Sequence, residues 1–234
     1  MNTFRTSGGE MAFLDVGNGP PVVLLHGFGS SSALWRDVVP ALAPRARVIA
    51  PDLIGFGSSE RLGASAIDSR AQAGYVRELL DHLGVDEIAV GGHGVGGVVA
   101  ELLAIEGRAR CLVLVDAGAV DPEGAHDPGP GADLAALDGI DVPALIVWGE
   151  DDPLLPVEAA ERLAGVLPRA VLVLLPGCSH FVPEEAPDTV TPLIAEFLRS
   201  RYLGLPHHHE HDRGALPGPV PIELRRAGGI RGPA

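Results

Sequence analysis

Short runs of apolar residues alternate with amphipathic segments along the chain. The apolar runs cover residues 21–27, 46–52, 87–92, 111–117, 142–150 and 170–177. They are continuous rather than alternating, which is typical of strands buried on both faces of a parallel sheet. Segments with the period of a helix lie at 32–43, 69–83, 95–106, 156–167 and 187–202. The pattern therefore predicts an α/β, doubly wound, mostly parallel sheet with helices on both faces.

The chain is predicted to form one domain over residues 1–202, followed by a tail over 203–234. A length of 234 residues with 46% hydrophobic content is enough for one substantial core. The tail is rich in Gly and Pro and lacks periodicity, so we expect a flexible extension. Its "HHHEH" at 207–211 contains residue types that bind metals, but a solvated polar run is the favoured interpretation.

Composition excludes several classes of function. The net charge of −14 disfavours nucleic acid as a partner. All 17 basic residues are arginine, so chemistry that needs a lysine amine is excluded. Neither a signal peptide nor an apolar run long enough to cross a membrane is found, which predicts a cytoplasmic protein without a membrane partner. Cys111 and Cys178 are expected to be free thiols.

Loops that follow predicted strands carry the residue types of a catalytic site, and ligands bind at this edge of such sheets. In "HGFGSSSALW" and "GGHGVGG", the backbone N–H groups of Phe28 and Val95 are expected to hold a developing oxyanion. Asp152 lies in "VWGEDDPLLP", and His180 lies in "PGCSHFVPEE" after the last predicted strand. We expect Asp152 to orient the His180 imidazole and to raise its basicity.

These motifs, over about residues 10–202, resemble those of the α/β-hydrolase fold family. The branch is that of small esterases, perhydrolases, epoxide hydrolases and haloalkane dehalogenases. The resemblance implies an oxyanion loop at His26, Gly27 and Phe28, with His26 and Gly27 at the substrate, and a following loop "PDLIGFGSS" at 51–59. It also implies a nucleophile elbow at 92–97, an acid at Asp152 and a base at His180. It further implies a hydrolase by lineage that acts on a small ester or related carbonyl compound, with no metal or organic cofactor.

The chain departs from the family pattern in two places. Gly94 stands where the elbow carries its nucleophile. Because glycine adopts positive φ without steric cost, the backbone frame is expected to survive while the attacking atom is lost. The second departure is the cap, which is reduced to residues 118–141, a segment rich in Gly, Pro and Asp. An open, shallow site is therefore predicted.

Three hypotheses about function follow from these departures. In the first, the chain is an enzyme without a covalent step, and His180 activates water. In the second, it is a non-catalytic descendant that binds a ligand or a partner. In the third, Gly94 replaces a Ser or Asp in an otherwise active hydrolase, and the reduced cap counts against this hypothesis. The sequence leaves the substrate and the oligomeric state open.

Other candidate residues have simpler interpretations. His93, beside the elbow, is expected to be a packed histidine. Asp116 is more readily a polar group at a strand end than an alternative acid, and attack by Cys178 would need an unusual backbone path. Ser30, Ser31 and Ser32 are expected to cap the helix that contains Trp35. The glycines of "GHGVGG" do not have the spacing of a dinucleotide fingerprint.

Overall fold

The computed structural model describes residues 1–60, 68–117, 137, 139–204 and 225–226. Most of the predicted cap region, 118–141, and most of the predicted tail lie outside the described residues, as does the "HHHEH" segment. The expectations for these three segments therefore remain predictions.

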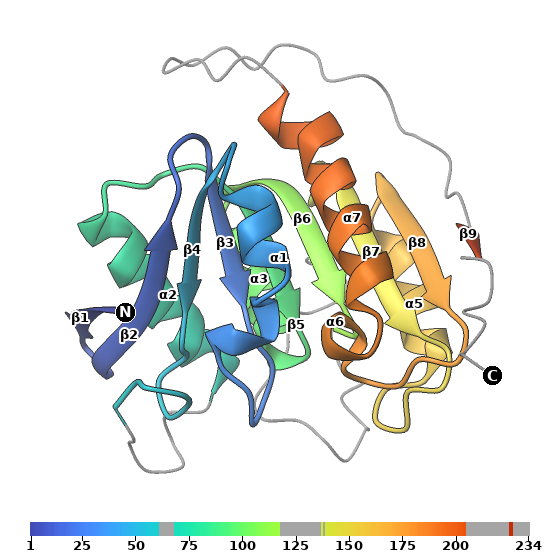
Figure 1. Cartoon of the computed structure of the whole chain (residues 1–234), viewed down its shortest axis with the longest axis horizontal. Helices are drawn as coiled ribbons and strands as arrows, with labels where there is room; N and C mark the ends of the chain where they lie inside the picture. The colour runs from blue at the N-terminus through green and yellow to red at the C-terminus, as the bar shows by residue number, and fades with distance from the viewer. Residues whose placement is uncertain (61–67, 118–136, 138, 205–224, 227–234) are drawn as a thin grey trace.

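A single twisted sheet forms the centre of the molecule (Figure 1). Its order is β1-β2-β4-β3-β5-β6-β7-β8-β9. The pairs from β4 to β9 are parallel, whereas β1–β2 and β2–β4 are antiparallel. The predicted doubly wound, mostly parallel sheet is therefore confirmed. The strands are β1 Asn2–Thr6, β2 Gly9–Val16, β3 Pro21–Leu25, β4 Arg47–Pro51, β5 Ile88–His93, β6 Ala109–Val115, β7 Ala144–Gly149, β8 Ala170–Leu175 and β9 Arg225–Arg226.

Helices cover both faces of the sheet, and Figure 1 shows α1, α6 and α7 on one face and α2, α3 and α5 on the other. The helices are η1 Ser32–Trp35, α1 Val38–Leu42, α2 Ser69–His82, α3 Val95–Ile105, α5 Val157–Val166, α6 Val182–Glu185, α7 Pro187–Leu198 and η3 Arg199–Leu203. Each face has its own apolar core, and each core includes side chains from the central strands. No helix among the described residues is long and apolar enough to cross a membrane.

The N-terminal hairpin of β1 and β2 was not anticipated from the apolar runs. Burial along β1 is sparse, so its residues do not form the continuous apolar run of a central strand. The hairpin turn is closed by the Thr6 hydroxyl, which donates to the Gly9 carbonyl at 2.8 Å. This hairpin supplies the antiparallel edge of an otherwise parallel sheet.

The predicted helix over 32–43 is divided into η1 and α1. Ser31 caps η1, because its hydroxyl accepts a bond from the Ala33 amide at 3.3 Å, as expected for this group of serines. The predicted helix over 187–202 ends as α7 at Leu198 and continues as the π-helical turn η3. Within the predicted tail, the two residues of β9, Arg225–Arg226, pair in parallel with β8.

Candidate active site

The turn between β5 and α3 has the backbone of a nucleophile elbow. Gly94 lies at its apex with φ of 52° and ψ of −123°, a conformation that L residues adopt only under strain. The flanking glycines allow the strand and helix to approach closely. A Cβ at Gly92 would lie 2.1 Å from the Gly96 carbonyl oxygen, and one at Gly96 would lie 2.4 Å from the His26 carbonyl oxygen. The frame of the elbow is therefore intact at Gly94.

A side chain at position 94 would point between the oxyanion loop and His180. A Cβ on Gly94 would lie 3.6 Å from His180 Nε2 and 3.6 Å from the Gly27 Cα atom. Both distances are ordinary van der Waals contacts, so the position can accept a side chain without a clash. The structure thus brings the glycine, the oxyanion loop and the histidine together at one edge of the sheet.

Asp152 and His180 form a hydrogen-bonded pair across two loops, one after β7 and one after β8. His180 Nδ1 donates to Asp152 Oδ2 at 2.7 Å. The other Asp152 oxygen accepts from the amides of Leu154 at 2.7 Å and Leu155 at 3.0 Å. Burial opposes ionisation of Asp152, but the bonds from His180 and the two amides outweigh it and lower its pKa. Asp152 is therefore a fixed anion that holds the histidine with Nε2 turned towards Gly94.

The amides of Phe28 and Val95 belong to two backbone segments beside Gly94, the loop after β3 and the start of α3. Val95 is the first residue of α3, so its amide has no acceptor within the helix. No hydrogen bond found among the described residues uses the amide of Phe28. The Phe28 side chain is 62% exposed and lies edge-on to Phe56, with ring centroids 5.4 Å apart. Neither amide is used in the loop and turn backbone bonds found among the described residues.

His26 does not lie where substrate contact was expected. Its side chain is fully buried, and both ring nitrogens are bonded inside the protein. Nδ1 donates to the Gly27 carbonyl at 2.8 Å, and Nε2 accepts from the Leu53 amide at 2.9 Å. Burial lowers its pKa, which favours the neutral ring that these two bonds require. His26 therefore positions the loop, whereas Gly27 lies directly against the candidate site.

Asp52 is a positioning residue that the sequence analysis did not single out, although it lies in the "PDLIGFGSS" loop. Its carboxylate accepts from the Ser32 amide and from the Ser58 amide, both at 2.7 Å. Its backbone carbonyl accepts from the Ser59 hydroxyl at 2.5 Å. Asp52 thus joins the oxyanion loop to the loop after β4. Its position directly after an apolar strand was the feature of the sequence that could have identified it.

Two further residues hold the loop that carries His180. His93 Nε2 lies 2.8 Å from the His180 carbonyl oxygen. Burial lowers the His93 pKa to about 4, so the ring is neutral and packed, as expected for this residue. Glu185, which was not anticipated, accepts from the amides of Ser179 at 2.6 Å and Phe181 at 3.1 Å.

The alternative acid, Asp116, and the alternative nucleophile, Cys178, are in none of the hydrogen bonds found for His180 among the described residues. Asp116 is buried after β6, and its carboxylate accepts from the Gly149 amide at 2.8 Å rather than from His180. Burial raises its pKa to about 9, so it is protonated at neutral pH. Cys178 is a free, buried thiol within the core on the α7 face of the sheet, and Cys111 is likewise free and buried.

No group of three His, Cys, Asp or Glu side chains suited to a metal ion occurs in the part of the chain that the structure describes. The polar groups beside Gly94 are one imidazole, one buried carboxylate and two backbone amides. This set can move a proton and stabilise an oxyanion.

Comparisons with known proteins agree with the observed arrangement of strands and helices. A model of the alpha/beta hydrolase fold matches residues 20–137, and a model of the alpha/beta hydrolase family matches residues 121–193. Haloalkane dehalogenase 2 of Mycobacterium tuberculosis is 30% identical over 265 aligned positions, covering 82% of this chain and 93% of the relative. Among solved structures, a meta-cleavage product hydrolase from Pseudomonas fluorescens superposes with a TM-score of 0.79 at 21% identity, covering 86% of this chain and 98% of the other. A thermophilic esterase from Thermogutta terrifontis superposes with a TM-score of 0.76 at 26% identity, with the same two coverages. The chain therefore belongs to the alpha/beta hydrolase fold family.

Proposed function

We propose that this chain is a hydrolase that acts on a small ester or related carbonyl compound without a covalent intermediate. His180, held by Asp152, is the general base, and the amides of Phe28 and Val95 form the oxyanion hole. The observation that carries the proposal is that His180 Nε2 faces the position where a side chain of residue 94 would begin, 3.6 Å away. Water takes the place that a nucleophilic side chain would occupy.

In this mechanism, a water oxygen bonds to the carbonyl carbon while His180 Nε2 takes its proton. The carbonyl oxygen becomes an oxyanion between the two amides. The tetrahedral intermediate then breaks the bond to the alcohol, and His180 returns the proton to the leaving oxygen. The products are a carboxylic acid and an alcohol, so atoms and protons balance.

Membership of the alpha/beta hydrolase fold family supports hydrolysis as the reaction, and Gly94 limits the range of possible substrates. A dehalogenase or epoxide hydrolase reaction at this elbow would need a carboxylate at position 94, and the glycine supplies none. An ester needs only an activated water and an oxyanion hole, and an esterase is among the structurally similar proteins. Esters are therefore the favoured substrates.

The predicted small cap is part of this proposal. The alignment with the mycobacterial dehalogenase runs over 265 positions, more than the 234 residues of the whole chain, so the relative has residues without a counterpart here. Such an insertion would be a cap. A chain with a reduced cap has less surface to define one substrate, so we expect broad tolerance of the acyl group.

The test is hydrolysis of a series of short-chain p-nitrophenyl esters by the unmodified protein, by His180→Ala and by His82→Ala. His82 is an exposed histidine on α2, outside the site, and serves as the matched control. Turnover above background that is lost in His180→Ala and kept in His82→Ala supports the proposal. Equal rates in all three proteins would refute it.

The second candidate is a non-catalytic descendant that binds a ligand at the same position. The observation that favours it is Gly94 itself, because the elbow has no attacking atom. This candidate predicts saturable binding of a small carboxylic acid beside Gly94, without turnover of any ester in the series. If the unmodified protein binds the acid saturably but has no esterase activity, and Gly94→Ser gains that activity, the result supports this second candidate over the first.

A further inference from the structure

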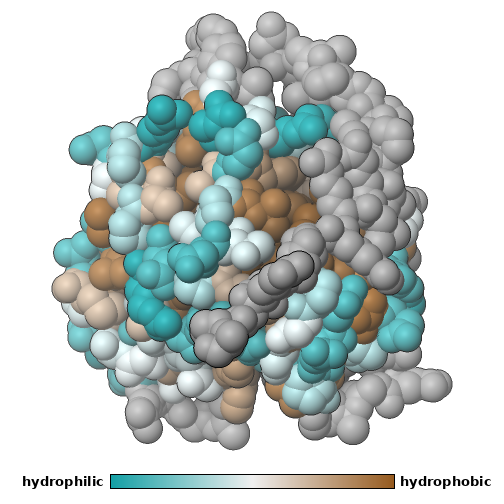
Figure 2. Space-filling model, turned by 45° about the vertical axis from the view of Figure 1, so that its right-hand side comes forward, coloured by the Kyte–Doolittle hydropathy of each residue, from teal (hydrophilic) through white to brown (hydrophobic). Residues whose placement is uncertain are grey.

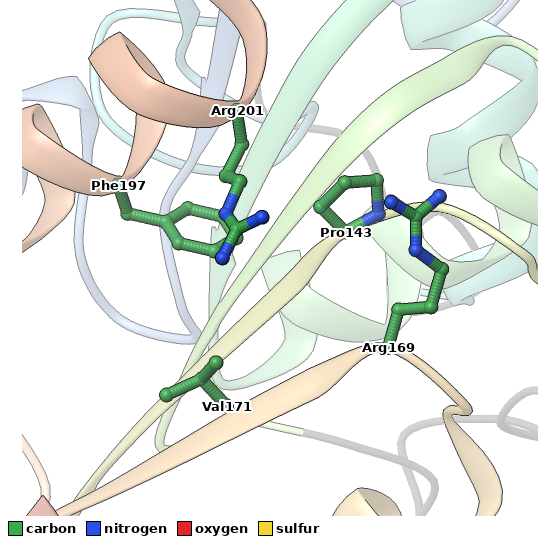
Figure 3. Close-up of a pocket in the computed structure, with 5 residues that line it drawn as sticks. All are labelled: Pro143, Arg169, Val171, Phe197 and Arg201. Carbon is green, nitrogen blue, oxygen red and sulfur yellow. The ribbon is translucent and has the colours of Figure 1, made fainter. Parts of the chain in front are cut away.

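A second group of charged side chains lies at the amino ends of the strands, whereas Gly94 lies at the carboxyl ends. There, a small cavity is lined by Pro143, Arg169, Val171, Phe197 and Arg201 (Figure 3). Pro143 directly precedes β7, and Arg169 directly precedes β8, so the cavity is at the amino ends of these strands. The candidate active site is at the carboxyl ends, and the two sites share no residue.

Arg169 is the unusual residue of this cavity. Its side chain is only 6% exposed, yet its Nε and Nη1 atoms have no hydrogen-bond partner among the described residues. Arg169 is also in none of the ion pairs found in the described part of the chain. Arginine keeps its charge in proteins, and a buried charge without a partner is costly. Within the described residues, Arg169 is therefore a buried cation with two unpartnered donor atoms, which an anion would stabilise.

Arg201 brings a second guanidinium to the same cavity. Both arginines line the cavity, and Figure 3 shows the guanidinium of Arg201 over the ring of Phe197 and that of Arg169 beside Pro143. Both arginines also act on the thiol of Cys111. Burial raises the Cys111 pKa to about 12, and the two positive charges oppose this shift. The positive charges of Arg169 and Arg201 are therefore both close enough to affect the same buried thiol.

We propose that this cavity binds the carboxylate of a small organic monoacid between Arg169 and Arg201. A carboxylate is planar and matches the fork of N–H donors on a guanidinium. The cavity has room for about one water-sized group, so one carboxylate oxygen enters it and the rest of the acid stays at its mouth.

The charge of the whole protein favours a monoanion. With a net charge of −14, the molecule repels anions at a distance, and the repulsion grows with the charge of the ligand. The local pair of arginines offsets this repulsion only at short range. A singly charged acid therefore meets the smallest barrier to entry.

The test is calorimetric titration of the full chain with sodium butyrate, sodium phosphate and sodium chloride at equal ionic strength. The variants are Arg169→Gln and Arg201→Gln. Arg162→Gln, at an exposed position on α5 outside the cavity, is the matched control. We expect saturable butyrate binding that weakens about tenfold or more in either cavity variant, because each loses charged hydrogen bonds, and that is unchanged in the control. His180→Ala should also bind normally, which separates this site from the candidate active site.

A second measurement tests the unpaired charge itself. Arg169→Met removes the buried cation and keeps an apolar side chain of similar length, so its melting temperature without ligand should exceed that of the unmodified protein. Butyrate should then raise the melting temperature of the unmodified protein but not that of this variant. Binding of butyrate that persists in both Gln variants would overturn the proposal, as would saturable binding of phosphate alone or of none of the three anions. None of these outcomes depends on ester hydrolysis.

Discussion

His93 is hydrogen-bonded to the backbone carbonyl of His180, so the His180 imidazole keeps its own bond to Asp152. The carbonyl oxygen of His180 can only accept, so His93 Nε2 carries the proton of this 2.8 Å bond. The two rings lie 4.7 Å apart and are tilted by 54°. The neutral ring of His93 therefore fixes the backbone from which the candidate base projects.

Replacement of His93 by Phe tests this positioning role. The ring volume is kept but the hydrogen bond to the His180 carbonyl is lost, so the position of the His180 imidazole relative to Gly94 should be less well fixed. In a protein with measurable esterase activity, we expect kcat to fall roughly 10- to 100-fold with a smaller change in KM. Steady-state kinetics with one p-nitrophenyl ester provides the measurement. An unchanged kcat would show that the loop is held without His93, for example by Glu185.

Gly94→Ser is expected to create a nucleophile within reach of His180. The Cβ has room at this position, and the positive φ adds strain of about 1–3 kcal/mol to the folded state. We expect a gain of ester hydrolysis and a burst of p-nitrophenol as the acyl-enzyme forms. Gly94→Ala is the matched control, because it carries the same strain without the hydroxyl. Equal activity in the two variants would contradict a nucleophilic role for the new serine.

Glu101 on α3 should make stability depend on pH. It is fully buried, neither carboxylate oxygen has a hydrogen-bond partner among the described residues, and burial raises its pKa from 4.5 to about 8. Between these two values the folded protein holds a proton that the unfolded chain releases. Stability therefore falls as the pH rises through this window, by about 1.4 kcal/mol per pH unit for this single group.

The variant Glu101→Gln isolates this effect from those of other buried groups. Its free energy of unfolding relative to the unmodified protein should increase from pH 4.5 to pH 8, and urea unfolding at both ends of the window measures the difference. Asp116 acts in the same direction, with a pKa of about 9, and is unchanged in both proteins. A difference that is flat across the window would show that Glu101 ionises normally.

Two glycine substitutions should change stability in opposite directions. A Cβ at Gly96 would overlap the backbone of His26 and Leu25, so Gly96→Ala should cost about 1–3 kcal/mol through overpacking. Gly165 on α5 has open space around the same position, so Gly165→Ala should stabilise the helix by about 0.5–1 kcal/mol. Thermal unfolding of both variants provides the comparison. A loss of stability in Gly165→Ala would contradict the open space found around an added Cβ at that position.

Much of the fold could be predicted from the sequence because central parallel strands are long apolar runs. The hairpin of β1 and β2 was missed because β1 is a sparsely buried edge strand and β2 is buried over only about half of its length. The relation of Gly94, Asp152 and His180 could be expected from motifs at strand ends. The positioning role of His26, the bonds of Asp52 and the unpaired Arg169 could not, since each depends on which backbone groups lie across a loop or a cavity.

The positive φ of Gly94 also bears on how this protein can change by mutation. A glycine codon that ends in a pyrimidine becomes a serine, cysteine or aspartate codon by a single base change. Each of these residues would enter an elbow whose backbone already has the required shape, with His180 Nε2 facing it. With such a codon at position 94, one base change would place a nucleophilic side chain on a turn that already has this backbone conformation.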